Sequence, residues 1–263
     1  MGVLHRRVEI ATRQLEEGAS EARACVEDDF HHFRLWARAR FGQVVNIKTW
    51  ALRNPTNLCP AAGERVSDLI AMPLNEASAA VNERADARQQ CTHQFDLAGL
   101  AIAALARKIP RRTYKAAIPD RIDGATTATL WRDGEEILKW AIDGNNITGP
   151  DPYSGISLGG GFTGFARNLP TLDEAEASLV LRRAVFITTG RRENHPDRPV
   201  VMPTPIPGAA SAAAQPRTGP MGGCWVWQPE RAPITIGNDN KQDFTDRPEV
   251  LTADDQDWLA FVD

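Results

Sequence analysis

The feature that most constrains the fold is the period-two pattern of residues 33–40 (FRLWARAR), in which apolar and basic side chains alternate except at Trp36. Side chains two residues apart on a β-strand point to the same face, so this period of two predicts a strand with one buried face. Gly42 then offers a turn, and residues 44–50 are rich in β-branched and aromatic side chains, which predicts a returning strand. Residues 21–26 are expected to add a third strand.

Two helices are expected after these strands. Apolar residues recur at helical spacing from Leu58 to Ile70, and Pro73 closes that run. A clearer helical pattern runs from about Thr92 to Arg107, where the basic end suits the helix dipole. Residues 75–90, between the two, are polar and are expected to form a short helix or a loop.

The second half begins with a hairpin signal. Residues 126–131 and 137–142 flank an Asp-Gly turn, and residues 172–183 follow as a helix with Thr171 as its N-cap. The sequence therefore predicts an α+β fold with an N-terminal antiparallel sheet packed by helices. The expected regions are an α+β domain over 1–109, a smaller β-hairpin and helix region over 110–192, and an extended arm over 193–263 that is rich in Pro, Ala and Gly.

Charge and hydropathy exclude some functions. A net charge of -4 offers no basic face for nucleic acid, and no run approaches the roughly 18 apolar residues that a membrane-spanning helix needs. Four cysteines in 263 residues do not make a disulfide scaffold. We therefore expect a cytoplasmic protein that binds neither nucleic acid nor a membrane.

Histidine, cysteine and aspartate cluster in the first region. His31 and His32 follow Asp28 and Asp29, and on a strand they point to opposite faces, so only one of them joins a given site. Cys59 and Cys91 are each expected at a helix start, where the dipole favours the thiolate. His32, Cys59, Cys91 and His93 would form a tetrahedral set for zinc or iron, although the spacing matches no standard zinc finger. The alternative is that these are ordinary core, turn and helix-start residues.

The order of these elements resembles a known family. Cys59-Pro60-Ala61-Ala62 and residues 93–98 (HQFDLA), placed at helix starts after a strand meander, resemble the U-type iron–sulfur cluster assembly scaffold proteins over about residues 20–109. Gln94 stands where that family has its last cysteine, Asp28, Asp29 or His31 stands where it has its first, and Cys91 is extra. The same cysteine and histidine segments are also similar to an uncharacterised bacterial family with no established activity.

Two functions follow as hypotheses. The first is an enzyme, a lyase or isomerase acting on a small, partly apolar or aromatic acid. A metal or His32 would polarise the substrate and His31 or His93 would be the general acid/base, or the histidines alone would transfer the protons. Asp29 would orient a histidine and Arg34 would hold the carboxylate of the substrate. The second is a protein that binds and delivers a metal or an iron–sulfur species. The tryptophans near the C-terminus are expected to dock on the body or on a second subunit, which favours a homodimer.

Overall fold

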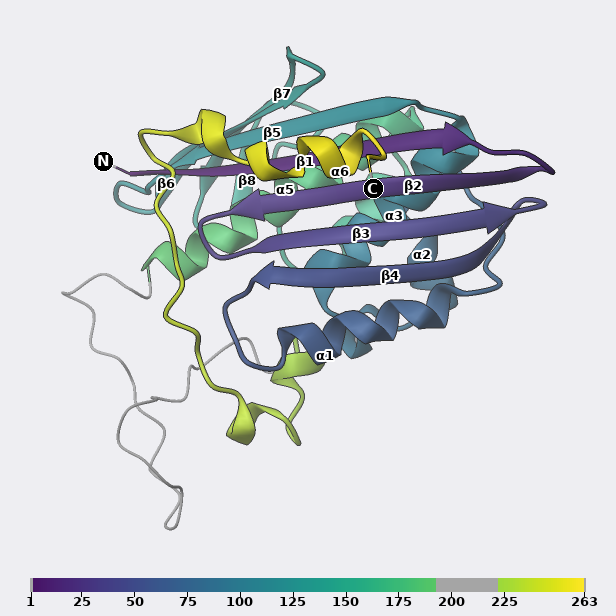
Figure 1. Cartoon of the computed structure of the whole chain (residues 1–263). Coiled ribbons are helices and arrows are strands. Elements are labelled where there is room, and N and C mark those ends of the chain that lie inside the picture. The colour runs from purple at the N-terminus through teal and green to yellow at the C-terminus, as the bar shows by residue number, and fades with distance from the viewer. Residues whose placement is uncertain (1, 193–221, 263) are drawn as a thin grey trace.

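The computed structural model describes residues 2–192 and 222–262, which include one eight-stranded sheet with the order β4-β3-β2-β1-β5-β6-β7-β8 (Figure 1). All neighbouring strands pair antiparallel. The strands are β1 Val3–Gln14, β2 Ala19–Asp28, β3 His32–Arg40, β4 Gln43–Arg53, β5 Arg111–Pro119, β6 Ala125–Arg132, β7 Glu135–Asp143 and β8 Asn146–Gly149. The fold is thus α+β, as the alternating pattern predicts.

The long helices α3 and α5 cover one face of the sheet, here called the inner face. The α-helices are α1 Cys59–Glu64, α2 Val81–Arg84, α3 Thr92–Arg107, α4 Phe162–Arg167, α5 Leu172–Arg192 and α6 Gln256–Leu259. Helix α3 packs on β1, β2 and β3, whereas α5 packs on β5, β6 and β7. Between them lies the main apolar core, in which Phe33, Phe95 and Trp140 are among the largest fully buried side chains.

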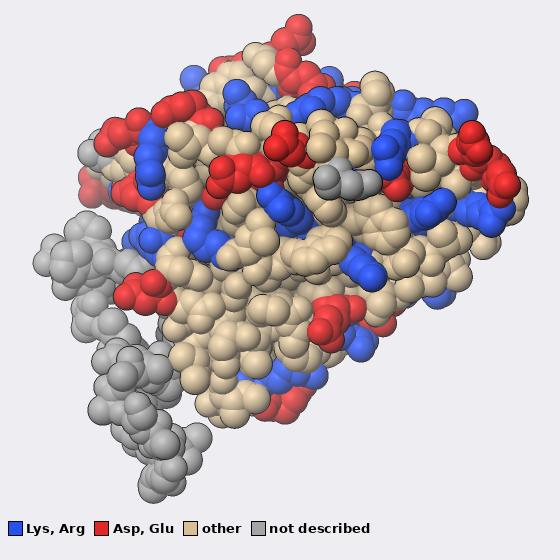
Figure 2. Space-filling view, viewed as in Figure 1, with Lys and Arg blue, Asp and Glu red and all other residues tan. Residues whose placement is uncertain are grey.

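The last described residues cover part of the opposite, outer face. Residues 222–262, here called the C-terminal segment, run past the ends of β4, β3 and β2 and then across the outer face of β1 and β2, where α6 contacts both strands (Figure 1). Short 3₁₀ helices complete the chain. They are Arg65–Leu69, Ser78–Ala80, Ala87–Gln89, Trp225–Trp227, Ala232–Ile234, Pro248–Val250 and Ala253–Asp255. Acidic and basic side chains are interspersed over the face of the molecule that carries the C-terminal segment (Figure 2).

Local patterns predicted several elements correctly. The expected strands appear as β2, β3 and β4, the long helical pattern appears as α3, and the hairpin appears as β6 and β7. Asp133 and Gly134 in its turn have φ values of 53° and 97°, the left-handed conformation that tight hairpin turns need. The helix expected over residues 58–70 is shorter, because α1 ends at Glu64 and a 3₁₀ helix continues to Leu69.

Three strands lie where none was expected, and the shortest of them is β8 at residues 146–149. Residues 3–14 form β1 and residues 111–119 form β5, and the two pair with each other, with Val8 opposite Tyr114. The expected regions 1–109 and 110–192 therefore share one sheet. Of the expected arm, residues 193–221 lie outside the described residues, while the C-terminal segment packs against the body. No helix in the described ranges is long and apolar enough to cross a membrane.

Candidate active site at the turn between β2 and β3

The turn between β2 and β3 is built around the carboxylate of Asp28. Its Oδ1 accepts hydrogen bonds from the backbone N–H groups of Phe30 and His31, at 2.9 and 3.0 Å. The N–H of Asp28 donates to the carbonyl of His31 at 2.9 Å. Aspartate often closes a turn in this way, because its short side chain reaches the backbone two or three residues ahead. The turn therefore sets the direction in which His31 projects.

A buried arginine neutralises the same carboxylate. Arg6 on β1 lies directly opposite Asp28 in the strand register, and its Nη1 contacts Oδ2 of Asp28. The two side chains are 4% and 0% exposed, so water scarcely screens the pair. Burial acts to raise the pKa of Asp28, but the positive charges of His31 and Arg6 outweigh it and hold that pKa below its usual value. Asp28 is therefore ionised at neutral pH.

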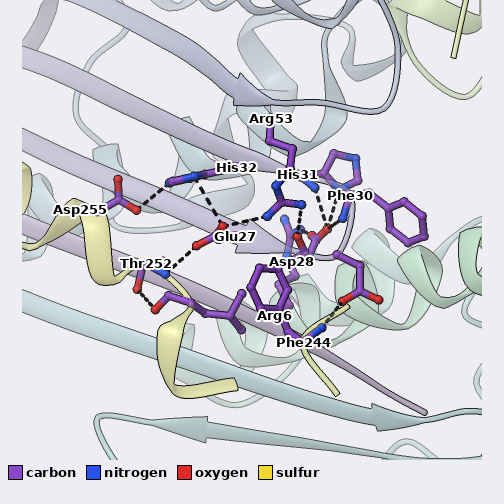
Figure 3. A network of polar contacts seen from close by, with 12 residues as sticks. Arg6, Glu27, Asp28, Phe30, His31, His32, Arg53, Phe244, Thr252 and Asp255 are labelled. Atoms are coloured by element: carbon purple, nitrogen blue, oxygen red, sulfur yellow. Dashed lines mark hydrogen bonds and ion pairs between the residues drawn. The ribbon is translucent and has the colours of Figure 1, made fainter. Parts of the chain in front are cut away.

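Asp28 also orients the imidazole of His31. Nδ1 of His31 lies 2.8 Å from Oδ1 of Asp28, so Nδ1 is the donor and Nε2 is left for another partner. The His31 ring packs on the ring of His93, with the centroids 4.0 Å apart and the planes inclined by 35°. Phe33 lies beside both rings. Figure 3 shows His31 turned toward Asp28, at the end of strands β2 and β3.

His93 is the less restrained of the two histidines. It lies in the first turn of α3, is partly exposed, and has no hydrogen bond through its ring to any residue of the described ranges. Burial, followed by the positive charges of His31, Arg6 and Arg183, holds the pKa of His93 well below its usual value. The ring is therefore a neutral imidazole at pH 7, with a free nitrogen beside an oriented histidine.

The two predicted cysteine ligands are buried thiols. Sγ of Cys59 lies 3.1 Å from Oγ1 of Thr56. Burial raises the pKa of Cys59 to about 12 and also raises the pKa of Cys91. The thiolates expected at these helix starts are therefore disfavoured, because desolvation outweighs the hydrogen bonds from Thr56 and Gln94 that act to lower the two pKa values.

His32 points to the outer face, away from His31, as strand alternation predicts. Its Nε2 lies 2.8 Å from Oδ2 of Asp255, and its Nδ1 lies 3.6 Å from Oε1 of Glu27. Arg34 donates to Asp255 at 2.5 Å, and Arg53 donates to Glu27 at 2.8 Å. We call these five residues the outer ionic cluster; Figure 3 shows its contacts around His32. The cluster ties the C-terminal segment to β2, β3 and β4.

The structure does not bring the predicted metal set together. His32 lies on the outer face, whereas Cys59, Cys91 and His93 belong to elements of the inner side. Within residues 2–192 and 222–262, the group with three ligand atoms inside 4.8 Å of one another is Glu27, His32 and Asp255. The arginines of the outer ionic cluster already occupy both of its carboxylates. The predicted set is therefore dispersed, and in the second set an ion would have to compete with Arg34 and Arg53 for the two carboxylates.

Two predicted catalytic residues have other partners. Asp29 does not orient a histidine; Asp28 does. Asp29 instead contacts Nη1 of Arg191, and its backbone carbonyl accepts a hydrogen bond from Gln242 at 2.9 Å. Burial raises the pKa of Asp29 to about 6. Arg34 belongs to the outer ionic cluster, so it is not placed to hold a substrate at His31.

Arg6 is the site residue that sequence reasoning missed. On β1 the inward positions Leu4, Val8 and Ile10 are apolar and buried, and Arg6 falls on the same face. A charge inside an apolar alternation needs a buried partner, so this break in the pattern was a usable signal. It could be interpreted only once residues 3–14 were assigned to a strand.

An open pocket of about 600 Å³ lies elsewhere, at the far end of α3. Arg107, Arg132, Tyr153 and Asp173 are among its lining residues. Arg107 is 14 residues beyond His93, which is about 20 Å along a helix. This pocket therefore does not serve the histidine pair.

Comparison with known proteins finds no family model that matches the chain and no curated protein that is similar to it.

Proposed function

We propose that the protein is an enzyme that transfers protons on a small organic acid, as a lyase or an isomerase, with His31 and His93 as its acid–base pair. The observation that carries the proposal is the Asp28–His31 hydrogen bond of 2.8 Å beside the neutral ring of His93. A histidine oriented by a buried carboxylate, with its second nitrogen free, is an arrangement used in general acid–base catalysis.

The two histidines have different roles in this proposal. His93, being neutral, accepts a proton from the substrate through its free ring nitrogen. His31 donates a proton from Nε2, either to the leaving group in an elimination or to a second carbon in an isomerisation. Asp28 remains ionised throughout and stabilises the imidazolium form of His31, while Arg6 keeps that carboxylate in place. Phe33 forms an apolar wall beside both rings, which suits a partly apolar acid.

Proton exchange with solvent tests the proposal without requiring that the overall reaction be known. The protein is incubated in D₂O with a panel of small aromatic and unsaturated carboxylic acids, and NMR follows deuterium incorporation and product formation. We expect His31→Asn and His93→Asn to lower the rate by about 10²–10⁴-fold, the usual contribution of a positioned acid or base.

His5→Gln is the matched control for this test. His5 lies on β1 and contacts neither of the two site histidines, so the variant should keep the full exchange rate. Unchanged exchange in both His31→Asn and His93→Asn would contradict the proposal. The predicted homodimer is checked on the same samples by sedimentation.

A further inference from the structure

One ion pair joins α3 and α5 next to the histidine pair. Nε of Arg183, on α5, donates to Oδ2 of Asp96, on α3, at 2.6 Å. Asp96 is three residues after His93, and residues three apart lie on the same face of a helix. Arg183 is therefore held on the side of α3 that carries His93.

Most of the hydrogen-bonding capacity of Arg183 is unused. Only its Nε is engaged by Asp96; in the described part of the chain, Nη1 and Nη2 have no hydrogen-bond partner. The side chain is 21% exposed, so these two nitrogens are accessible to a ligand. A guanidinium presents parallel N–H groups that match both oxygens of a carboxylate. Asp96 thus fixes the arginine at one nitrogen and leaves the others free.

The local charge favours an anion at this point. Arg183, Arg6 and His31 all act on His93 as positive charges. The compensating carboxylates are Asp28, which is shared by Arg6 and His31, and Asp96, which is 40% exposed. Helix α3 also begins here without a side-chain cap and without an acidic residue in its first turn, so its positive dipole end is uncompensated.

We propose that Arg183, oriented by Asp96, binds the carboxylate of the substrate and places the rest of the acid against His93. This inference rests on the proposed function for its assignment of the histidines as the reacting groups. It names a recognition residue that replaces Arg34, and it defines the substrate class as a small monocarboxylate. Arg183 is then a binding residue that touches substrate, and Asp96 is a positioning residue.

The test measures binding without turnover. Benzoate is the probe and benzamide, which has the same shape and no charge, is the reference; both are titrated into the full chain at constant ionic strength and followed by NMR chemical shifts. The wild-type protein should bind benzoate more tightly than benzamide. Arg183→Gln should weaken benzoate binding about 10–100-fold, the range expected for hydrogen bonds to a charged group, and leave benzamide unchanged.

Two further variants separate geometry, charge and folding. Arg183→Lys keeps the charge and a partner for Asp96 but loses the parallel donors, so it should fall between wild type and Arg183→Gln. Arg167→Gln on α4, where Arg167 is 44% exposed, is the control and should bind benzoate as wild type does. Thermal unfolding of each variant shows that it is folded.

The outcomes distinguish this inference from the proposed function. Equal wild-type affinity for benzoate and benzamide, or unchanged benzoate binding in Arg183→Gln, would overturn the carboxylate site even if the histidine variants lose proton exchange. Loss of benzoate binding in Arg183→Gln together with unaffected exchange in both histidine variants would instead retain the carboxylate site and reject His31 and His93 as catalysts.

Discussion

At the scale of single residues, Asp28 supports both the turn and the buried charge. Its two oxygens together serve two backbone N–H groups, the His31 ring and Arg6. Asp28→Asn would leave the charge of Arg6 uncompensated in the core, and we expect a loss of about 3 kcal/mol in the free energy of unfolding at pH 7, measured by urea denaturation. Glu16→Gln at an exposed position should change it by less than about 0.5 kcal/mol.

The stability of the Asp28→Asn variant should have a distinctive pH dependence. Because the pKa of Asp28 is lowered in the folded protein, its stabilisation is present above the ordinary aspartate pKa and is lost as pH falls through the folded value. The difference between wild type and Asp28→Asn should therefore shrink at the lowest pH at which the protein is still folded. A constant difference from pH 7 downward would show that the effect is steric rather than ionic.

The chemistry of individual residues was only partly predictable. The sequence singled out His31 and His93, and strand alternation separated His31 from His32 correctly. It could not assign the orienting carboxylate, because Asp28 and Asp29 are adjacent and only the turn geometry decides which one faces the ring. The sequence also could not predict that the thiol of Cys59 stays protonated, because its raised pKa depends on burial by residues far away in the chain.

At the scale of elements, the ion pairs of Asp255 anchor the C-terminal segment. Asp255 is fully buried and pairs with His32 and Arg34, whereas its neighbour Asp254 is exposed and contributes only its carbonyl. Asp255→Asn leaves buried cationic groups without their carboxylate, which costs about 3 kcal/mol. Amide exchange over residues 248–262 should then become about 100-fold faster.

Asp254→Asn provides the matched comparison for this anchor. The substitution removes one carboxylate from the same short helix but leaves the contact to Arg34 intact, so exchange should stay at the wild-type rate. Equal acceleration in the two variants would mean that overall charge, rather than the outer ionic cluster, holds this segment.

Elements with local signals were predictable, and those that need distant partners were not. The hairpin of β6 and β7 and helix α3 carry their turn residues and periodicity within a short stretch. Strand β5 starts with two arginines and ends at a proline, so by itself it looks like a boundary. It becomes a strand because β1, about a hundred residues earlier, supplies its hydrogen-bond partner.

At the scale of the whole molecule, the arrangement of charge opposes a resident metal ion. Arg34 and Arg53 already occupy the carboxylates of the candidate triad, and the predicted cysteine–histidine set is dispersed. We expect purified protein to contain zinc and iron far below one equivalent by elemental analysis. Dialysis against a chelator should leave the melting temperature unchanged. Stoichiometric metal that is lost in a Cys59→Ala/His93→Ala double variant would refute this expectation.

The sheet also determines how the parts of the chain depend on one another. Residues 1–109 and 110–192 were expected as separate regions, yet β1 pairs with β2 on one side and with β5 on the other. Sequence patterns could not reveal this, because the pairing of distant strands leaves no local periodicity. Stability is therefore expected to be shared across that boundary.

The position of the C-terminal segment has a consequence for biosynthesis. Strands β1 and β2 are translated long before Leu259, which packs on Ala11 and Cys25. Until Leu259 has been made, the outer face of this hairpin lacks its cover, and the thiol of Cys25 is open to solvent and oxidants. The nascent chain is thus vulnerable to aggregation and to modification of this thiol until the C-terminal segment has been made and has packed on the sheet.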